Sequence, residues 1–161
     1  MSRFFSTLLA IACLAPILVQ FGCSVPSPMP GDAERGRYLI EIMGCNDCHT
    51  PGYMEKGGYI PEEDWLVGDT LGYRNDRGTV YPTNLRLLLN RMSEDEWISM
   101  ARRMRKQTPM MWVMLPKVRE IDLRAIYRFV TFLGPKGDPA PAPLPPNVEP
   151  TTRYINFGNP H

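Results

Sequence analysis

The chain begins with a long apolar run and then alternates between amphipathic segments and stretches rich in glycine and proline. Residues 4–21 carry no charged side chain, and a short positive start with Arg3 precedes them. A run of this length lies at the border between the apolar part of a signal peptide and a membrane-spanning helix. The pattern therefore predicts an export signal over residues 1–22, with an uncleaved membrane anchor as the alternative.

Four later segments have apolar residues at helical spacing with polar residues between them. The first opens at Asp32, whose side chain suits an N-cap, and Gly44 ends it. Ser93-Glu94-Asp95-Glu96 has the form of a capping box and predicts the start of another helix. The pattern predicts helices over residues 32–44, 84–92, 93–106 and 119–133.

The stretches between these helices carry glycine, proline and polar residues at short intervals, which is typical of loops. Residues 51–82 are predicted to form one long irregular loop, and residues 107–118 a shorter one. Loops longer than about fifteen residues are uncommon in compact domains unless they are functional or wrap something. Residues 134–161 are predicted to form a proline-rich tail and not a second domain, with residues 154–157 as a candidate segment to dock back.

Length and charge narrow the class of protein. The 161 residues suit one domain with peripheral segments. Eighteen basic residues against seventeen acidic residues leave no basic surface of the kind that nucleic-acid binding requires, so no nucleic-acid partner is expected. A core of this size buries little surface, and a bound cofactor would stabilise it.

Two of the four cysteines lie in the N-terminal region. Cys13 falls within the apolar run. Cys23 follows Gly22, as at the end of a bacterial lipobox, although Gln20 stands where an apolar residue is usual. The resemblance implies that Cys23 is lipidated and that a spacer over residues 23–31 follows it. We therefore expect the domain on the periplasmic side of a bacterial membrane, held by a lipid, with an uncleaved anchor or a soluble periplasmic form as alternatives.

The other two cysteines belong to the motif Cys45-Asn46-Asp47-Cys48-His49. Cys-x-x-Cys-His is the signature of c-type haem attachment. Two thiols at this spacing add to the two vinyl groups of a haem, and the adjacent histidine is carried under the iron as an axial ligand. Attachment of c-type haem follows export, which agrees with the predicted signal. The motif predicts one covalent haem c on Cys45 and Cys48, with His49 as an iron ligand.

Two other chemistries of paired cysteines fit the sequence less well. A thioredoxin-like Cys-x-x-Cys would follow a strand in a βαβ context, whereas this motif follows a predicted helix. A structural zinc site needs about four ligands, and beyond the motif the other histidine is His161 at the end of the tail. Haem attachment is therefore the interpretation that the sequence favours.

The second axial ligand of the haem iron is predicted to be a methionine. Histidine and methionine are the usual choices, and methionine raises the reduction potential. His161 lies beyond the proline-rich tail, whereas the loop before the last helix offers the sulfurs of Met110, Met111 and Met114.

These segments together resemble a bacterial class I cytochrome c, a small protein with one haem. The resemblance covers about residues 32–133 and rests on Gly36-Arg37-Tyr38, the motif extended by Thr50-Pro51, Tyr81-Pro82-Thr83-Asn84-Leu85, Pro109-Met110 and Asp122-Leu123-Arg124-Ala125-Ile126-Tyr127. It implies an all-α fold, in which helices pack around one covalently attached haem, with long loops and a proline-rich C-terminal tail. It also implies Met110 as the ligand, because the axial methionine of the family commonly follows a proline, although Met111 stands where a second proline is usual.

The resemblance further implies that the first and last helices touch, with Gly36 and Tyr38 meeting Tyr127 and its neighbours. Four polar or aromatic residues are candidates for hydrogen bonds to the haem propionates, with the anchoring of loops as the alternative role: Tyr81, Asn84, Arg86 and Trp112.

With protein ligands on both faces of the iron, the haem has no open position for a substrate. We therefore expect an electron carrier, not an enzyme, that passes single electrons between redox partner proteins at the membrane. One alternative is the cytochrome c subunit of a membrane-associated dehydrogenase or oxidase. A second alternative is a haem enzyme or gas sensor with a displaced methionine ligand.

Overall fold

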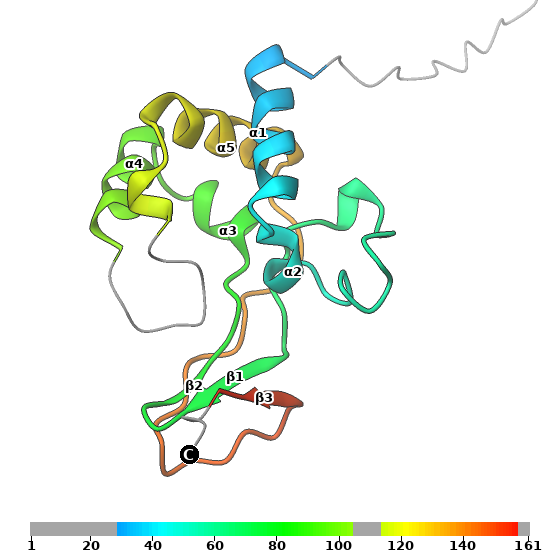
Figure 1. Ribbon diagram of the computed structural model, residues 1–161, viewed down its shortest axis with the longest axis vertical. Helices are drawn as coiled ribbons and strands as arrows, with labels where there is room; N and C mark the ends of the chain where they lie inside the picture. Colours follow the sequence, from blue (N-terminus) through cyan, green and yellow to red (C-terminus); the bar gives the residue numbers. More distant parts are fainter. Residues whose placement is uncertain (1–28, 105–113, 158–161) are drawn as a thin grey trace, which may run out of the picture.

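The computed structural model describes residues 29–104 and 114–157. Within these ranges the chain forms, in order, α1 (Gly31–Ile42), α2 (Cys45–His49), η1 (Glu62–Asp64), β1 (Gly72–Asn75), β2 (Gly78–Val80), α3 (Leu85–Leu89), α4 (Glu94–Arg103), η2 (Leu115–Lys117), α5 (Glu120–Leu133) and β3 (Tyr154–Asn156). The longer helices gather in the upper half of Figure 1, the strands lie together in the lower half, and α2 lies between the two groups.

The contact between α1 and α5, which the resemblance implied, forms the centre of the helical part. A Cβ atom on Gly36 would lie 2.0 Å from the backbone oxygen of Ala125, so the two helices approach more closely than any larger residue permits. The apolar stripes of the two helices meet around this point and are almost fully buried, at Leu39, Ile40, Leu123, Ile126, Phe129 and Val130. Burial of this stripe holds the first and last helices together.

The helix α4 begins with the predicted capping box and packs on α5. The backbone N–H of Ser93 donates to the Glu96 carboxylate at 2.6 Å, and the Glu96 N–H donates in return to the Ser93 hydroxyl. One turn further on, Trp97 is buried and its indole N–H donates to the backbone oxygen of Leu123 at 2.9 Å. This bond satisfies the polar atom of a large buried ring and fixes α4 against α5.

The predicted all-α fold class is wrong, because the chain also forms a mixed three-stranded sheet in the order β2-β1-β3. Strands β1 and β2 pair antiparallel, with Tyr73 opposite Val80, and form a hairpin within the predicted irregular loop. Both strands are short and begin with glycine, a residue with low β-propensity. The pattern of apolar residues therefore gave no strand signal, and pairing between the segments supplies the structure instead.

The third strand comes from the region predicted to be a polyproline-like tail. Residues 134–157, called the C-terminal segment from here on, run from the end of α5 to the sheet (Figure 1). Strand β3 pairs parallel with β1, with Ile155 opposite Tyr73. Midway along the segment, Leu144 and Thr79 exchange backbone hydrogen bonds of 2.8 and 2.9 Å. The segment is thus tied to the hairpin at two places.

Candidate functional site

The short helix α2 carries both cysteines and the histidine of the motif. Gly44 separates it from α1 with a left-handed backbone at φ 65°, and a Cβ atom there would lie 2.8 Å from the Asp47 carboxylate. Glycine is favoured in this conformation because it has no side chain to clash. Cys45 and Cys48 stand one turn apart, so their sulfurs lie on the same side of the helix. Both are half-buried, and neither forms a disulfide.

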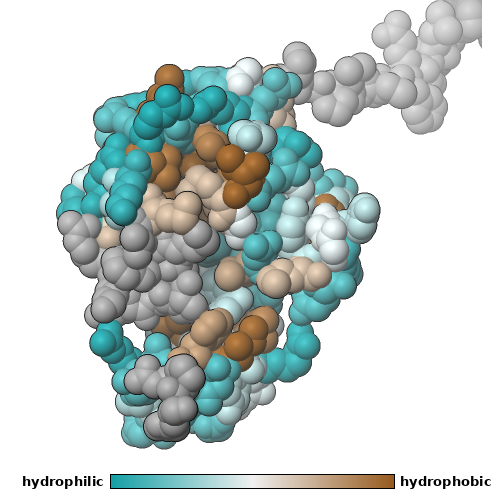
Figure 2. Space-filling view, viewed as in Figure 1, coloured by the Kyte–Doolittle hydropathy of each residue, from teal (hydrophilic) through white to brown (hydrophobic). Residues whose placement is uncertain are grey.

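The motif forms one wall of an apolar cavity of about 170 Å³. Cys45, Cys48 and His49 line it on one side. The other side consists of apolar side chains from α1, α3, α4 and α5, namely Ile40, Leu85, Leu89, Trp97, Ile126 and Val130. On the face shown in Figure 2, apolar residues gather near these helices and again lower down over the strands. The cavity is smaller than the roughly 300–1,000 Å³ of typical ligand sites.

His49 is positioned as a metal ligand. Its Nδ1 atom lies 2.7 Å from the backbone oxygen of Thr83, and only 7% of the residue is exposed. Because a carbonyl oxygen can only accept, Nδ1 carries the proton and Nε2 keeps its lone pair. Burial lowers the pKa of the imidazole below its usual range, which favours the neutral form that binds metals. Histidines that bind metals commonly donate the other ring N–H to a backbone carbonyl in this way.

The cysteines lack the properties of a redox pair. Burial raises the pKa of the Cys45 thiol to about 12, and the nearby Asp47 carboxylate adds to the rise. Reactive cysteines in Cys-x-x-Cys motifs have lowered pKa values, because the thiolate is the nucleophile. The motif also follows the helix α1 and not a strand. These observations argue against thioredoxin-like chemistry and leave two thiols without a disulfide facing an apolar cavity.

The roles of Thr83 and Tyr73 beside the motif were not predicted from the sequence. Thr83 acts through its backbone oxygen, which every residue type carries, so no side-chain signal could identify it. The Tyr73 hydroxyl lies 3.3 Å from the Cys48 sulfur and comes from β1, a strand that the sequence analysis did not predict. The hairpin brings this side chain to the motif.

Two of the candidates for propionate binding anchor loops. Arg86 is 4% exposed, and its guanidinium donates to the backbone oxygens of Gly134 at 2.6 Å, Glu63 at 2.7 Å and Leu133. It therefore caps the C-terminal end of α5, where a positive charge is favourable. The Asn84 side chain accepts the Leu87 N–H at the start of α3 and donates to two backbone oxygens of the C-terminal segment, those of Lys136 at 2.8 Å and Asp138 at 3.0 Å.

Of the remaining predicted site residues, the structure describes Tyr81 and Met114. The Tyr81 hydroxyl accepts a hydrogen bond from Thr152 at 3.3 Å. Met114, the last of the three loop methionines, is 44% exposed just before η2. The other predicted residues lie outside the described ranges: Met110, Met111, Trp112, Cys23 and His161.

No group of three or more His, Cys, Asp and Glu side chains in residues 29–104 and 114–157 is arranged to hold a metal ion. No helix in the same ranges is both long enough and apolar enough to cross a bilayer.

Taken together, the motif residues are suited to hold a haem. They supply two thiols for thioether bonds, a neutral imidazole with one nitrogen free for iron, and apolar walls that exclude water.

Comparison with known proteins adds no assignment: the chain matches no protein-family model, and no curated protein and no solved structure matches it.

Proposed function

We propose that this chain is a c-type cytochrome that carries one haem c on Cys45 and Cys48 and transfers single electrons between redox partner proteins. The observation that carries the proposal is the arrangement of α2. Two unpaired cysteines and a neutral histidine face one apolar cavity, and a backbone carbonyl fixes the histidine ring.

Each of these residues has a defined task. Cys45 and Cys48 would hold the cofactor through thioether bonds, and His49 through Nε2 and Met110 through its sulfur would bind the iron. Haem c, when bound, supplies an iron that changes between the ferric and ferrous states. The Thr83 carbonyl orients the imidazole and raises its basicity. The apolar walls exclude water and thereby favour the less charged state of the cofactor.

The N-terminal region supports a site of action outside the cytoplasm. Residues 4–21 have no charged side chain, and Cys23 follows Gly22 as in a lipobox. In this proposal the lipid on Cys23, or the uncleaved apolar run, tethers the domain to the periplasmic side of a membrane. The proline-rich spacer before α1 keeps the domain clear of the lipid surface.

Covalent attachment is tested by expressing the exported chain in cells that mature c-type haem. The wild-type protein should retain haem on a denaturing gel and show a mass increase of one haem. Replacement of both cysteines, Cys45→Ala with Cys48→Ala, should abolish both signals. Cys23→Ala is the matched control, since it removes a thiol but leaves the motif intact. A wild-type chain that gains no haem mass would overturn the proposal.

The axial ligands are tested by spectra of the oxidised and reduced protein, followed by addition of carbon monoxide to the reduced form. An electron carrier with two protein ligands should give a low-spin spectrum that carbon monoxide does not change. Met110→Ala should open one position and permit carbon monoxide binding. A wild-type protein that binds carbon monoxide would instead favour a ligand-binding haem protein, and a stable co-purifying partner would favour a subunit of a dehydrogenase or oxidase.

A further inference from the structure

The two faces of the small sheet differ in what covers them. Residues opposite one another in a sheet share a face, and alternate residues of a strand point to opposite faces. The register therefore places Tyr73, Val80 and Ile155 on one face. Phe157 joins them, because its ring stacks on the Tyr73 ring with centroids 5.5 Å apart.

The opposite face is covered by the C-terminal segment itself. Arg74 donates to the backbone oxygens of Val148 at 2.7 Å and Pro146 at 2.9 Å, and its guanidinium lies 5.8 Å from the centre of the Tyr154 ring. On this face the Arg74 guanidinium is therefore paired with backbone oxygens of the C-terminal segment.

The first face instead points toward the motif. The Tyr73 hydroxyl lies 3.3 Å from the Cys48 sulfur, which is one of the two candidate attachment atoms. Beside Tyr73, Ile155 is 43% exposed and Phe157 is 49% exposed. Ile155 and Phe157 both lie against Tyr73, whose hydroxyl reaches the Cys48 sulfur. A flat apolar group held at Cys48 would remove part of this exposed apolar surface from water.

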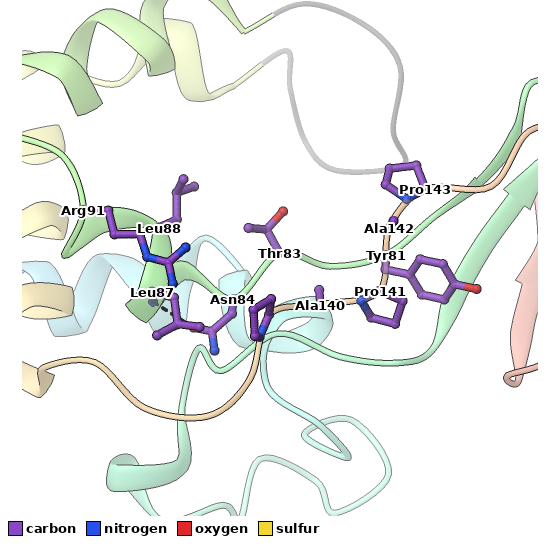
Figure 3. A pocket seen from close by; sticks show the side chains of 11 residues that line it. Tyr81, Thr83, Asn84, Leu87, Leu88, Arg91, Ala140, Pro141, Ala142 and Pro143 are labelled. Atoms are coloured by element: carbon purple, nitrogen blue, oxygen red, sulfur yellow. Dashed lines mark hydrogen bonds between the residues drawn. The ribbon is translucent and has the colours of Figure 1, made fainter.

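A second part of the C-terminal segment lies beside Thr83, whose backbone oxygen holds the His49 ring. Its residues Pro139–Pro143 and the helix α3 enclose a cavity of about 290 Å³. Figure 3 shows Leu88 and Thr83 on one side of this cavity and Pro141, Ala142 and Pro143 on the other. Thr83 also holds the His49 ring, so this part of the segment lies beside the residue that fixes the axial ligand.

We propose that the haem edge at Cys48 packs on the sheet face formed by Tyr73, Ile155 and Phe157, so that the C-terminal segment buries part of the cofactor. The inference rests on the proposed function and goes beyond the motif, since it assigns haem contacts to residues at the end of the chain. Burial of this edge disfavours the more charged ferric state, because charge is less well solvated in apolar surroundings. The segment therefore raises the reduction potential.

The test compares the potentials of three holoprotein variants measured by redox titration. Ile155→Ala and Phe157→Ala remove apolar cover from the face that points toward Cys48, and each should lower the potential. The expected change in the redox equilibrium constant is about threefold or more, where tenfold corresponds to about 59 mV for one electron. Tyr154→Ala is the matched control, because it removes a ring from the same strand on the opposite face and should leave the potential unchanged.

The outcomes separate the possible explanations. An equal fall of the potential in Tyr154→Ala would mean that loosening of β3 is the cause and would overturn the packing proposal. Unchanged potentials in Ile155→Ala and Phe157→Ala, with slower electron exchange with a protein partner, would assign the face to partner docking and likewise overturn it. A wild-type chain without covalent haem would overturn the proposed function as well, whereas a normal holoprotein with insensitive potentials would overturn this packing alone.

Discussion

The helical part and the C-terminal segment are held in place by different forces. In the helical part, side chains such as Phe129 and Leu123 are completely buried. The C-terminal segment is held by hydrogen bonds from backbone and side chains, such as the 2.8 Å bond from Thr79 to Leu144 and those of Asn84, while Ile155 and Phe157 stay partly exposed. The first part depends on exclusion of water and the second on directional pairing.

This difference predicts unequal stability within one molecule. A buried large apolar side chain contributes about 1.5–3 kcal/mol, whereas a hydrogen bond contributes about 0.5–1.5 kcal/mol net. Regions with few buried apolar contacts open at lower free energy than the core. We therefore expect the C-terminal segment to detach from the sheet without unfolding of the helices.

The largest effect on stability is expected from Gly36→Ala, which disturbs the contact between α1 and α5 in the helical part. The added Cβ atom would meet the Ala125 backbone oxygen at 2.0 Å, so α1 and α5 must separate. We expect a loss of about 3 kcal/mol in the free energy of unfolding, measured with urea. Gly31→Ala is the control, since a Cβ there meets nothing within 4 Å. Equal effects of the two substitutions would contradict the close contact.

The next effect concerns Arg86, which joins the two parts. Arg86→Ala leaves the backbone oxygens of Leu133 and Gly134 without their charged donor, while the Glu63 oxygen keeps the Lys136 ammonium at 2.9 Å. We expect a loss of about 2 kcal/mol in the free energy of unfolding. Arg91→Ala removes an exposed arginine just beyond the same helix and should change the stability little. A similar loss in both variants would show that charge in this region, and not the bonds of Arg86, is responsible.

A smaller and local effect is expected from Gly78→Ala. Gly78 has a left-handed backbone at φ 122°, and a Cβ atom would lie 2.1 Å from the Leu144 backbone oxygen. The bridge between Thr79 and Leu144 should weaken, so hydrogen exchange of both amides should accelerate about tenfold, equivalent to about 1.4 kcal/mol. The amide of Trp97, bonded within α4, should keep its wild-type exchange rate. Faster exchange at Trp97 would contradict independent opening of the C-terminal segment.

The smallest effect lies at the polar edge of the helical part and depends on pH. The Arg35 and Arg119 side chains donate to the Asp122 carboxylate at 2.6 and 2.9 Å and hold the pKa of that carboxyl below its ordinary value of 3.8. A lowered folded-state pKa stabilises the fold above the unfolded-state value, and this contribution is lost as the pH falls through the folded-state value.

Asp122→Asn should therefore flatten the dependence of the melting temperature on pH below about 4, with a change of under about 1 kcal/mol because both arginines are partly exposed. Thermal unfolding between pH 6 and pH 2 measures this. A wild-type melting temperature that falls no faster than that of the variant in acid would contradict the role of Asp122.

The sequence allowed the helices to be predicted because their signals are local. The capping box at Ser93 and the apolar stripe over residues 119–133 are complete within a few turns. The docking of residues 154–157 was predicted, but the sheet was missed because its strands have three or four residues and β3 finds its partner in a distant part of the chain. No local pattern encodes such a pairing.

The candidate site divides in the same way. The motif alone identified Cys45, Cys48 and His49 through the spacing that haem attachment requires. The Thr83 carbonyl and the Tyr73 hydroxyl reach these residues only through the folded chain. The predicted ligand Met110 lies outside the described residues and stays a prediction.

The parallel pairing of residue 72 with residue 154 also has a consequence for the order of folding. Closing a long loop carries an entropic cost that grows with its length, and contacts distant in sequence form slowly. The contact between α1 and α5 joins residue 36 to residue 125 and is at least as distant, so the individual helices form before either long-range contact closes. Under the proposed function, α2 and its two thiols would thus form before β3 completes the sheet, and haem attachment would precede that last pairing.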